Sequence, residues 1–415
     1  MDQSGRGSVL VIGSGYELFR RYLLAGVARR ATVVLLDASP PGWQRPYLLD
    51  GRQVDLTDRP AVLAAAGDMV AAHGVDAVLT WDEKLVAVAA EVGAELGIAT
   101  MPVHAARACR DKLLQREVLA RAGVPSARSM LAGTPEQART AAAELGYPVV
   151  VKPRAAAASV AVRVAADDDE LSAAVDLVAE LDAAIGADYE SRPGVLVEEL
   201  LRGREISVDA WVLDGEVGPL VVAHKRVGFP PYFVETGHVV GAPLEPTVLD
   251  AVLDVVTAAN RALGVDRCIT HTEVMLTDSG PRVVEVNGRI GGDLIPYVGE
   301  LVTPGLSVGE VAATVAQGIR PEQQKAPDRV IGIHFVYPGH DMVFQTLSAP
   351  DALRGADWVV DIRQVSGPGT ELRLPPRAFL DRAGYCLVGG EDLESVSRRL
   401  DEVAARVVAV GAALA

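Results

Sequence analysis

The chain has 415 residues, of which 49% are hydrophobic, so it is long enough to bury the cores of two or three domains. Its formal net charge of -16 argues against a nucleic-acid partner, because phosphate contacts need clustered lysine and arginine. Three cysteines without metal-ligand spacing argue against a disulfide framework, and no apolar run approaches the roughly 20 residues that span a bilayer. We therefore expect a soluble cytoplasmic protein whose partners are small molecules, with no membrane contact.

Residues 1–105 alternate between strand and helix patterns, which predicts parallel βαβ units and a doubly wound sheet. The runs SVLVIGSG, ATVVLLD and VDAVLTW are the expected strands, and an amphipathic or Ala-rich helical pattern follows or precedes each. Gly13, Gly15 and Asp37 resemble half of a dinucleotide fingerprint, but Leu18 stands where the third glycine would be. A tight first turn of the sheet accounts for these glycines, so NAD binding is only a minor alternative.

Residues 106–320 change to an α+β rhythm. DKLLQREVLARAG predicts a helix with Asp111 as its N-cap, and PVVVKP and SVAVRVA predict an antiparallel hairpin around the loop RAAAA. GVLVEELL and EISVDAWVLDGEVGPLVVAHKRV predict strands, the second broken by a turn at Asp214 and Gly215. GFPPYFVETGHVVGAPL reads as an irregular loop that contains His238. The segment 318–329 reads as a linker, and 321–415 as a small α+β domain.

The stretch THTEVMLTDSGPRVVEVNGRIGG, residues 270–292, predicts a hairpin with a three-residue turn at Asp278, Ser279 and Gly280. That register sets Glu273 opposite Glu285 and His271 opposite Asn287, all on one face, and continues the face through Met275 and Val283. Opposed carboxylates repel unless a cation lies between them, and Mg²⁺ or Mn²⁺ prefers such hard oxygen ligands. An exposed polar face with two ordinary glutamates is the alternative.

Several other charged residues stand in apolar surroundings. Lys152 lies within the strand pattern VVVKP, where a buried ammonium needs an anion, either a phosphate or a nearby glutamate. Lys112 opens a helix and, taken alone, is equally compatible with a solvated surface lysine. Glu198 and Glu199 are adjacent in a strand and therefore point to opposite faces, and Glu205 follows Gly203 at the next strand. An exposed turn of mixed charge would also explain these glutamates.

Taken in order, these motifs resemble the ATP-grasp superfamily over about residues 106 to 320, and the loop and tail resemble its carboxylate-amine ligase branch. The nearest subgroup is the L-amino acid ligases, which make dipeptides. The resemblance implies an α/β ATP-grasp fold with three parts. These are a pre-ATP-grasp βα domain (1–105), a central domain (106–320) with a lid at about 120–197, and a C-terminal domain (321–415).

The resemblance also implies nucleotide contacts. Lys112 and Lys152 match the lysines that contact the phosphates, and Ser159 ends the phosphate loop RAAAAS. The adenine-reading segment begins at Glu198 and Glu199 and continues through Leu200 and Leu201, while Glu205 matches the carboxylate that binds the ribose. The loop departs from the family in having no glycine, and alanine does not easily adopt positive φ.

The remaining implied roles concern the metal and the substrates. Mg²⁺ or Mn²⁺ would be held by Glu273, Glu285 and Asn287, and Arg289 and His238 would assist the transferred phosphoryl group. The substrate pocket is expected at Glu83, Arg289, Gly292 and Asp293, where the charge of Asp293 could select an amine.

The function implied is an ATP-dependent ligase that joins a carboxylate to an amine through an acyl phosphate. A carboxylase-like enzyme that activates bicarbonate and a non-catalytic nucleotide-binding regulator are the alternatives, and a homodimer is the expected assembly.

Overall fold

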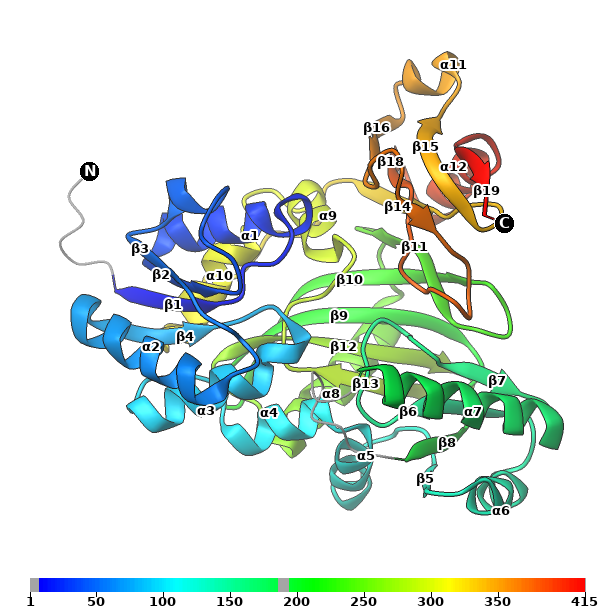
Figure 1. The fold of residues 1–415 in the computed structure, drawn as a ribbon, viewed down its shortest axis with the longest axis horizontal. Coiled ribbons are helices and arrows are strands. Elements are labelled where there is room, and N and C mark those ends of the chain that lie inside the picture. The colour runs from blue at the N-terminus through cyan, green and yellow to red at the C-terminus, as the bar shows by residue number, and fades with distance from the viewer. Residues whose placement is uncertain (1–6, 186–193, 415) are drawn as a thin grey trace.

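The computed structural model describes residues 7–185 and 194–414, so the first six residues of the expected N-terminal domain and residues 186–193 of the expected lid lie outside it. Figure 1 shows four sheets in the described chain: a parallel one near the N-terminus, a long central one, a small one beneath it and another small one near the C-terminus. The α/β class and the ATP-grasp arrangement expected from the sequence are confirmed.

The N-terminal sheet has four parallel strands in the order β3-β2-β1-β4. Alternate residues of β1 pack to opposite sides: Val9 and Val11 contact helices α1 and α10, and Leu10 and Ile12 contact α2 and α3. The doubly wound sheet is therefore confirmed. Its elements are β1 (Ser8–Ile12), α1 (Glu17–Arg30), β2 (Thr32–Asp37), η1 (Arg45–Tyr47), β3 (Asp50–Gln53), α2 (Arg59–His73), β4 (Val75–Leu79), η2 (Glu83–Leu85) and α3 (Val86–Leu96).

Helix α10 (Val308–Ala316) completes the N-terminal layer although it comes from the central part of the chain (Figure 1). It crosses α1 closely, because a Cβ on Gly26 would lie only 2.9 Å from the Cα of Gly309. The N-terminal domain and the central domain therefore share one hydrophobic core.

The lid is a four-stranded sheet in the order β5-β8-β6-β7, with helices α6 and α7 packed against it. The expected hairpin of PVVVKP and SVAVRVA is present, because β6 pairs antiparallel with β7, but β7 begins only at Arg163 and is shorter than predicted. Helices α4 and α5 precede the lid, and Asp111 caps α5 by accepting hydrogen bonds from the Leu113 and Leu114 amides, as predicted. These elements are α4 (Val103–Arg110), α5 (Lys112–Arg121), β5 (Ser129–Ala132), α6 (Pro135–Leu145), β6 (Val149–Pro153), β7 (Arg163–Ala165), α7 (Asp168–Ile185) and β8 (Val195–Glu199).

The central sheet has eight strands in the order β13-β12-β9-β10-β11-β14-β18-β16. Along β9 the side chains alternate: Ile206 and Val208 pack against α8, whereas Ser207 and Asp209 face the other way, toward the lid and the N-terminal domain. This alternation produces the polar face that carries the site. The central elements are β9 (Arg204–Leu213), β10 (Glu216–Gly228), β11 (Val234–Val240), α8 (Pro246–Leu263), β12 (Cys268–Thr277), β13 (Gly280–Asn287) and α9 (Ile295–Val302).

Strands β14, β16 and β18 of the expected C-terminal domain extend this same sheet, because β14 pairs with β11. The linker expected at 318–329 has no helix or strand, and the strand that follows it, β14, joins the same sheet as β11, which precedes it. The last elements are β14 (Val330–Val336), β15 (Met342–Ser348), α11 (Asp351–Arg354), β16 (Val359–Gln364), β17 (Glu371–Leu372), β18 (Gly384–Gly390), α12 (Leu393–Arg406) and β19 (Val408–Ala413).

In the described ranges, none of the helices combines the length and the apolar character that crossing a bilayer requires. The three cysteines are free thiols, and Cys109 and Cys386 are buried.

Candidate active site

A cleft opens between the central sheet, the lid and the C-terminal segment, with about 1310 Å³ of empty space that includes part of the open solvent. Most residues that the sequence singled out line it, although they come from five strands, one helix and three loops. These residues are Lys112, Lys152, Ser159, Glu198, Glu199, Leu200, Leu201, Glu205, Glu273, Glu285, Asn287, Arg289, Gly292 and Asp293. Glu83 and His238 do not line it.

The hairpin of β12 and β13 forms the floor of the cleft. The predicted pairs are present, with Glu273 opposite Glu285 and His271 opposite Asn287. The predicted turn is wrong, because Thr277 pairs directly with Gly280 across a two-residue turn. A bulge between Glu273 and Val274 then restores the expected register beyond it.

Because of the bulge, the prediction that Met275 and Val283 continue the polar face of the hairpin is wrong. Met275 lies opposite Arg282 rather than opposite Val283, and Val283 pairs with Val274 in the core. Glu285 and Asn287 keep their predicted positions because the shorter turn and the bulge offset each other in the register.

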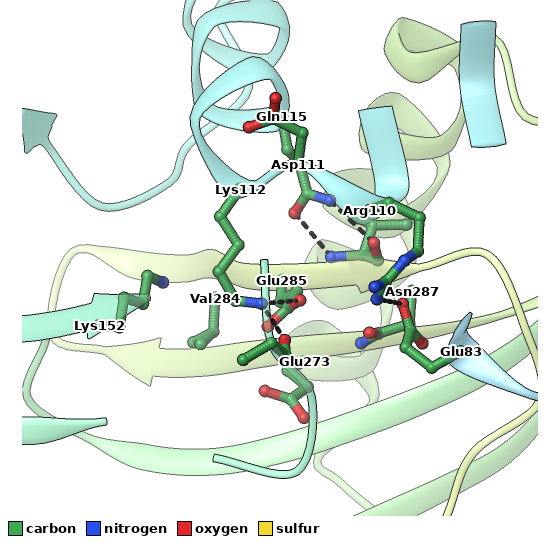
Figure 2. Close-up of polar contacts among 12 residues, drawn as sticks. Glu83, Arg110, Asp111, Lys112, Gln115, Lys152, Glu273, Val284, Glu285 and Asn287 are labelled. Carbon is green, nitrogen blue, oxygen red and sulfur yellow. Dashed lines mark hydrogen bonds and ion pairs between the residues drawn. The ribbon is translucent and has the colours of Figure 1, made fainter. Parts of the chain in front are cut away.

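Lys112 reaches from the first turn of α5 onto this floor. Its Nζ lies 2.9 Å from the Glu285 Oε1 and donates to the carbonyl oxygen of Ala156 at 2.5 Å (Figure 2). The side chain is buried, so the reading of Lys112 as a solvated surface lysine is wrong. One cation therefore connects the floor of the cleft to the phosphate loop.

Lys152 points into the cleft from β6 and forms an ion pair with Glu198, at 2.6 Å between Nζ and Oε2. Arg116 of α5 contacts the other oxygen of Glu198 at 2.8 Å. Burial alone would raise the pKa of Glu198, but Arg116 and Lys152 outweigh it and lower this pKa to about 2. Both predicted partners for Lys152 are thus compatible with its position: it has a glutamate, and it faces the cleft.

The sequence did not single out Lys225 of β10, which lies behind the same face. Its Nζ is 2.7 Å from Glu205, 3.0 Å from Glu273 and 3.6 Å from Glu235. Although burial opposes the charge, these carboxylates raise the pKa of Lys225 well above its usual value. Lys225 lies within the apolar run LVVAHKRV, so the argument that identified Lys152, a charged residue inside a strand pattern, would also have identified Lys225.

His271 forms the second support of Glu273. Its Nδ1 contacts the buried Asp209 Oδ1 at 2.6 Å, and its Nε2 lies 3.7 Å from Glu273. Burial lowers the pKa of His271, but Asp209 and Glu273 together raise it to about 9. His271 is therefore an imidazolium at neutral pH, and Asp209, which the sequence had not indicated, stabilises it.

The donors on the floor fit a divalent cation. Glu273, Glu285 and Asn287 offer two carboxylates and one amide on neighbouring strands, and the only hydrogen bond from the Asn287 amide in the described chain is a long one of 3.4 Å from Nδ2 to the His271 carbonyl oxygen. Among the described residues no three His, Cys, Asp or Glu side chains form a complete metal site by themselves. Mg²⁺ keeps several waters and substrate phosphates in its shell, so this small donor set suits it.

Arg289 follows β13 and is held from behind. Its Nε lies 2.5 Å from Glu83 Oε2, and the other oxygen of Glu83 is 2.7 Å from Arg110 Nη1 (the Arg110 contact is drawn in Figure 2). Burial alone would raise the pKa of Glu83, but the two guanidinium groups lower it to about 2. Glu83 was expected in the substrate pocket, whereas its carboxylate is engaged by two arginines and positions Arg289.

Asp293 lines the cleft beside Gly292 and adopts φ +51°. Arg382, from the C-terminal segment, binds it with both terminal nitrogens, at 2.6 Å and 2.8 Å. The guanidinium of Arg382 also stacks 3.8 Å from the ring centroid of Phe335. The C-terminal segment thus reaches the part of the cleft where the substrate pocket was expected, which no motif in the sequence had indicated.

His238 is not in an irregular loop, as expected, but in strand β11 between β10 and β14. It is fully buried, and its Nδ1 lies 3.2 Å from Glu235 Oε1. The many aromatic and proline residues before Val234 suggested a loop, but the alternation that follows them is strand. His238 therefore contacts a carboxylate at the cleft wall and does not reach the cleft itself.

Comparison with known proteins agrees with this geometry. The ATP-grasp domain family matches residues 145–297, and L-amino acid ligase C-terminal domain 2 matches residues 334–410. Alanine–anticapsin ligase of Bacillus subtilis is 26% identical over 79% of this chain and 76% of its own length. Phosphoribosylamine–glycine ligase of Streptomyces coelicolor is 30% identical, covering 84% of this chain and 83% of the relative.

The solved structure of L-amino acid ligase from Bacillus licheniformis superimposes with a TM-score of 0.81, at 21% identity, over 98% of this chain and 100% of that one. The chain belongs to the ATP-grasp superfamily. Within it the chain is an L-amino acid ligase-like enzyme, an ATP-dependent ligase that forms a C–N bond between a carboxylate and an amine.

The phosphate loop of this ATP-grasp protein closes without glycine. Ala158, Ser159 and Ala161 all adopt positive φ, at 59°, 55° and 57°. The expectation that alanine would avoid this conformation is wrong here, and each such residue costs about 1 kcal/mol of backbone strain. The loop has therefore the turned shape that glycine usually provides, at some cost in stability.

The glycine turn of the N-terminal sheet has a structural use. Asp37 accepts hydrogen bonds from both the backbone amide and the hydroxyl of Ser14, between the two glycines. Gln44 and Trp81 also bond to Ser14, through its hydroxyl and its carbonyl oxygen. Membership of the ATP-grasp superfamily, rather than the partial fingerprint, accounts for this domain, so the NAD-dependent oxidoreductase is discarded.

Proposed function

We propose that this enzyme uses ATP to activate the carboxylate of an amino acid and joins it to an amine, releasing ADP and phosphate. The observation that carries the proposal is the convergence of Lys112, Lys152 and Arg289 with the Glu273, Glu285 and Asn287 face in one cleft. The C-terminal match to an L-amino acid ligase domain supports an amine rather than bicarbonate as the acceptor. The glycine-free loop is folded and faces the cleft, which supports catalysis over a purely regulatory role.

In this proposal Lys112, Lys152 and Ser159 bind the nucleotide phosphates at the mouth of the phosphate loop. The charge of Lys112 is balanced by Glu285, and that of Lys152 by Glu198. The adenine would lie along Glu198, Glu199, Leu200 and Leu201, and Glu205 would bind the ribose, as all of these line the same cleft.

Glu273, Glu285 and Asn287 would hold Mg²⁺ or Mn²⁺, which supplies positive charge beside the phosphates. The two glutamates face each other across the hairpin, and His271 and Lys225 hold Glu273 in place from the sides. Lys112 lies beside Glu285 and is attached to the loop through the Ala156 carbonyl oxygen, so it would be placed to contact a phosphate oxygen next to such a cation.

Two steps follow from this arrangement. A carboxylate oxygen of the first substrate attacks the γ-phosphorus of ATP, and the bond from that phosphorus to the bridging oxygen of ADP breaks, which forms an acyl phosphate. The amine nitrogen of the second substrate then attacks the acyl carbon, the carbon–oxygen bond to phosphate breaks, and the nitrogen loses one proton. Arg289, which Glu83 holds in place, provides positive charge next to the phosphoryl group as it is transferred.

The decisive test is ADP release with amino acids offered singly and in pairs, together with mass analysis of the products. Turnover that needs both a carboxylate and an amine would support the proposal. Release that depends on bicarbonate alone would favour the carboxylase-like alternative, and tight ATP binding without release under any condition would favour a regulator.

We also propose that the enzyme is a cytoplasmic homodimer. Three free thiols suit a reducing compartment, and twofold dimers are the commonest assembly of soluble enzymes. Light scattering on the purified protein would give the assembly directly.

A further inference from the structure

Arg20 of helix α1 is a positively charged side chain in partly buried surroundings. Helix α1 turns Leu23, Leu24 and Val27 into the core shared with α10. Arg20 lies three and four residues before Leu23 and Leu24, so it continues their inward-facing stripe toward the N-terminal end of the helix, although it does not itself line the cleft. An arginine therefore stands where the helical pattern calls for an apolar residue.

The contacts of Arg20 are few. Its Nη1 donates one long hydrogen bond of 3.4 Å to the carbonyl oxygen of Gly291, and its aliphatic stem covers Gly15, whose Cβ would lie 3.1 Å from the Arg20 Cγ. Within residues 7–185 and 194–414 no carboxylate lies within 4.0 Å of its guanidinium. By contrast, Lys112, Lys225 and Arg382 each have a carboxylate oxygen within 3.0 Å.

A half-buried guanidinium without a carboxylate is unfavourable unless a ligand supplies one. Burial lowers the pKa of Arg20, and only the more distant Asp82 and Asp293 among the carboxylates raise it. Gly291, which Arg20 contacts, lies between Arg289 and the cleft residues Gly292 and Asp293. A Cβ on Gly292 would meet nothing within 4 Å, so there is room for a bound group beside it.

The chemistry of the proposed reaction says what that group is. When two amino acids are joined, the carboxylate of the first and the amine of the second disappear into the amide. The ammonium of the first and the carboxylate of the second persist, so the site must match one positive and one negative charge. Asp293 is suited to the ammonium, because Arg382 holds it in place while a quarter of its side chain (25%) stays exposed to solvent.

We propose that Arg20 binds the α-carboxylate of the amine-donating amino acid and so sets the preference of the enzyme for an acceptor that carries this group. This inference rests on the proposed ligase function and adds to it the residue that recognises the acceptor. Arg20 is the matching cation because Arg289 is engaged by Glu83 and is assigned to the phosphoryl group.

The test compares acceptors that differ only at the α-carboxylate. Each L-amino acid that the wild-type enzyme accepts is paired with its α-carboxamide, which cannot be phosphorylated and can act only as an acceptor. We expect Arg20→Met to raise KM for the amino acid acceptor by about 10- to 100-fold, as for loss of a hydrogen-bonded charge, with little change in kcat. KM for the matching amide should not change, so the wild-type preference for the free acid should disappear.

Arg21→Met is the matched control, since Arg21 lies on the exposed side of the same helix and pairs with Glu17. It should behave as the wild type with both acceptors. Arg20→Lys, which keeps a charge without the planar fork, should recover part of the preference for the acid and guards against a simple folding defect.

Equal KM values of the wild type for acid and amide acceptors would overturn the inference while the ligase function stands. So would an Arg20→Met enzyme that loses kcat equally with both acceptors, because that is the result of a structural role. Absence of ADP release from the wild type with every pair would instead remove the proposed function, and the inference with it.

Discussion

The two halves of the cleft treat buried cations differently. In the nucleotide half, Lys112, Lys152 and Lys225 each lie within 3.0 Å of a carboxylate. In the half proposed for the substrates, Arg289 and Arg382 are similarly paired, whereas Arg20, which lies beside this half without lining it, has no carboxylate within 4.0 Å among the described residues. The difference indicates that cations paired with protein carboxylates stabilise the shape of a binding site. A cation without a carboxylate partner indicates instead where a negatively charged ligand group would bind.

Glu285→Ala should have the largest effect, because it removes a proposed metal ligand and the partner of Lys112 together. We expect ADP release to fall by about a thousandfold or more. Glu322→Ala, in the exposed segment after α10, is the control and should retain activity. A Glu285→Ala enzyme that melts normally and still turns over would remove the metal assignment from this half of the cleft.

Lys225→Met tests whether the nucleotide half is stabilised by its own pairs. It leaves Glu205, Glu273 and Glu235 close together without their shared ammonium, which should cost about 3–5 kcal/mol in the free energy of unfolding. Urea denaturation would measure this loss. Adding Glu205→Gln should return part of it, and Lys325→Met, on the exposed linker, should change nothing; an unchanged midpoint for Lys225→Met would contradict the comparison.

The ion pairs of Glu198 with Arg116 and Lys152 should make the free energy of unfolding depend on pH, with a smaller effect. The folded pKa of Glu198, about 2, lies below its usual value of 4.5, so its ion pairs stabilise the fold fully above pH 4.5. That stabilisation, about 3 kcal/mol by linkage, is lost as the pH falls toward 2. The stability difference between the wild type and Glu198→Gln should therefore shrink between pH 6 and pH 3, in urea titrations at each pH; a difference that grows on acidification would show the opposite shift.

Ala158→Gly should have the smallest effect. Glycine removes about 1 kcal/mol of strain at φ 59° but adds about 0.5–1 kcal/mol of unfolded-chain entropy, so the melting temperature should rise slightly or stay level. Ala157→Gly, next to it but without positive φ, should carry only the entropic cost and melt earlier. If the two variants melt alike, the loop is not strained at Ala158.

Much of the site was predictable because its spacing is local. The hairpin register placed Glu273 and Glu285 opposite each other, although the turn was one residue too long, since the bulge at Val274 compensated for it. Lys152 was found from its charge in an apolar pattern, whereas Lys112 was assigned through the resemblance to the ATP-grasp superfamily. The same signal was present at Lys225 and at Arg20, where a charge interrupts a buried stripe.

What the sequence could not give were partners brought together by the tertiary fold. Arg382 is 89 residues from Asp293, and Arg289 is far from Glu83 in sequence, so neither pair has a local signature. The prediction for His238 was wrong because the predicted loop, which begins with a proline- and aromatic-rich run, was extended over residues that form strand β11. Pairings within one hairpin follow from periodicity, whereas pairings between domains depend on how the sheets pack.

The continuous central sheet has a consequence for how the chain behaves when it is cut. Residues 319–329 are largely exposed and have no helix or strand, so a protease would find them accessible. Strand β14, which follows this segment, remains hydrogen-bonded to β11, which precedes it, and their side chains share buried cores. A nick at this position would therefore give two fragments on a denaturing gel but one particle in solution, with Arg382 still bound to Asp293 across the cut.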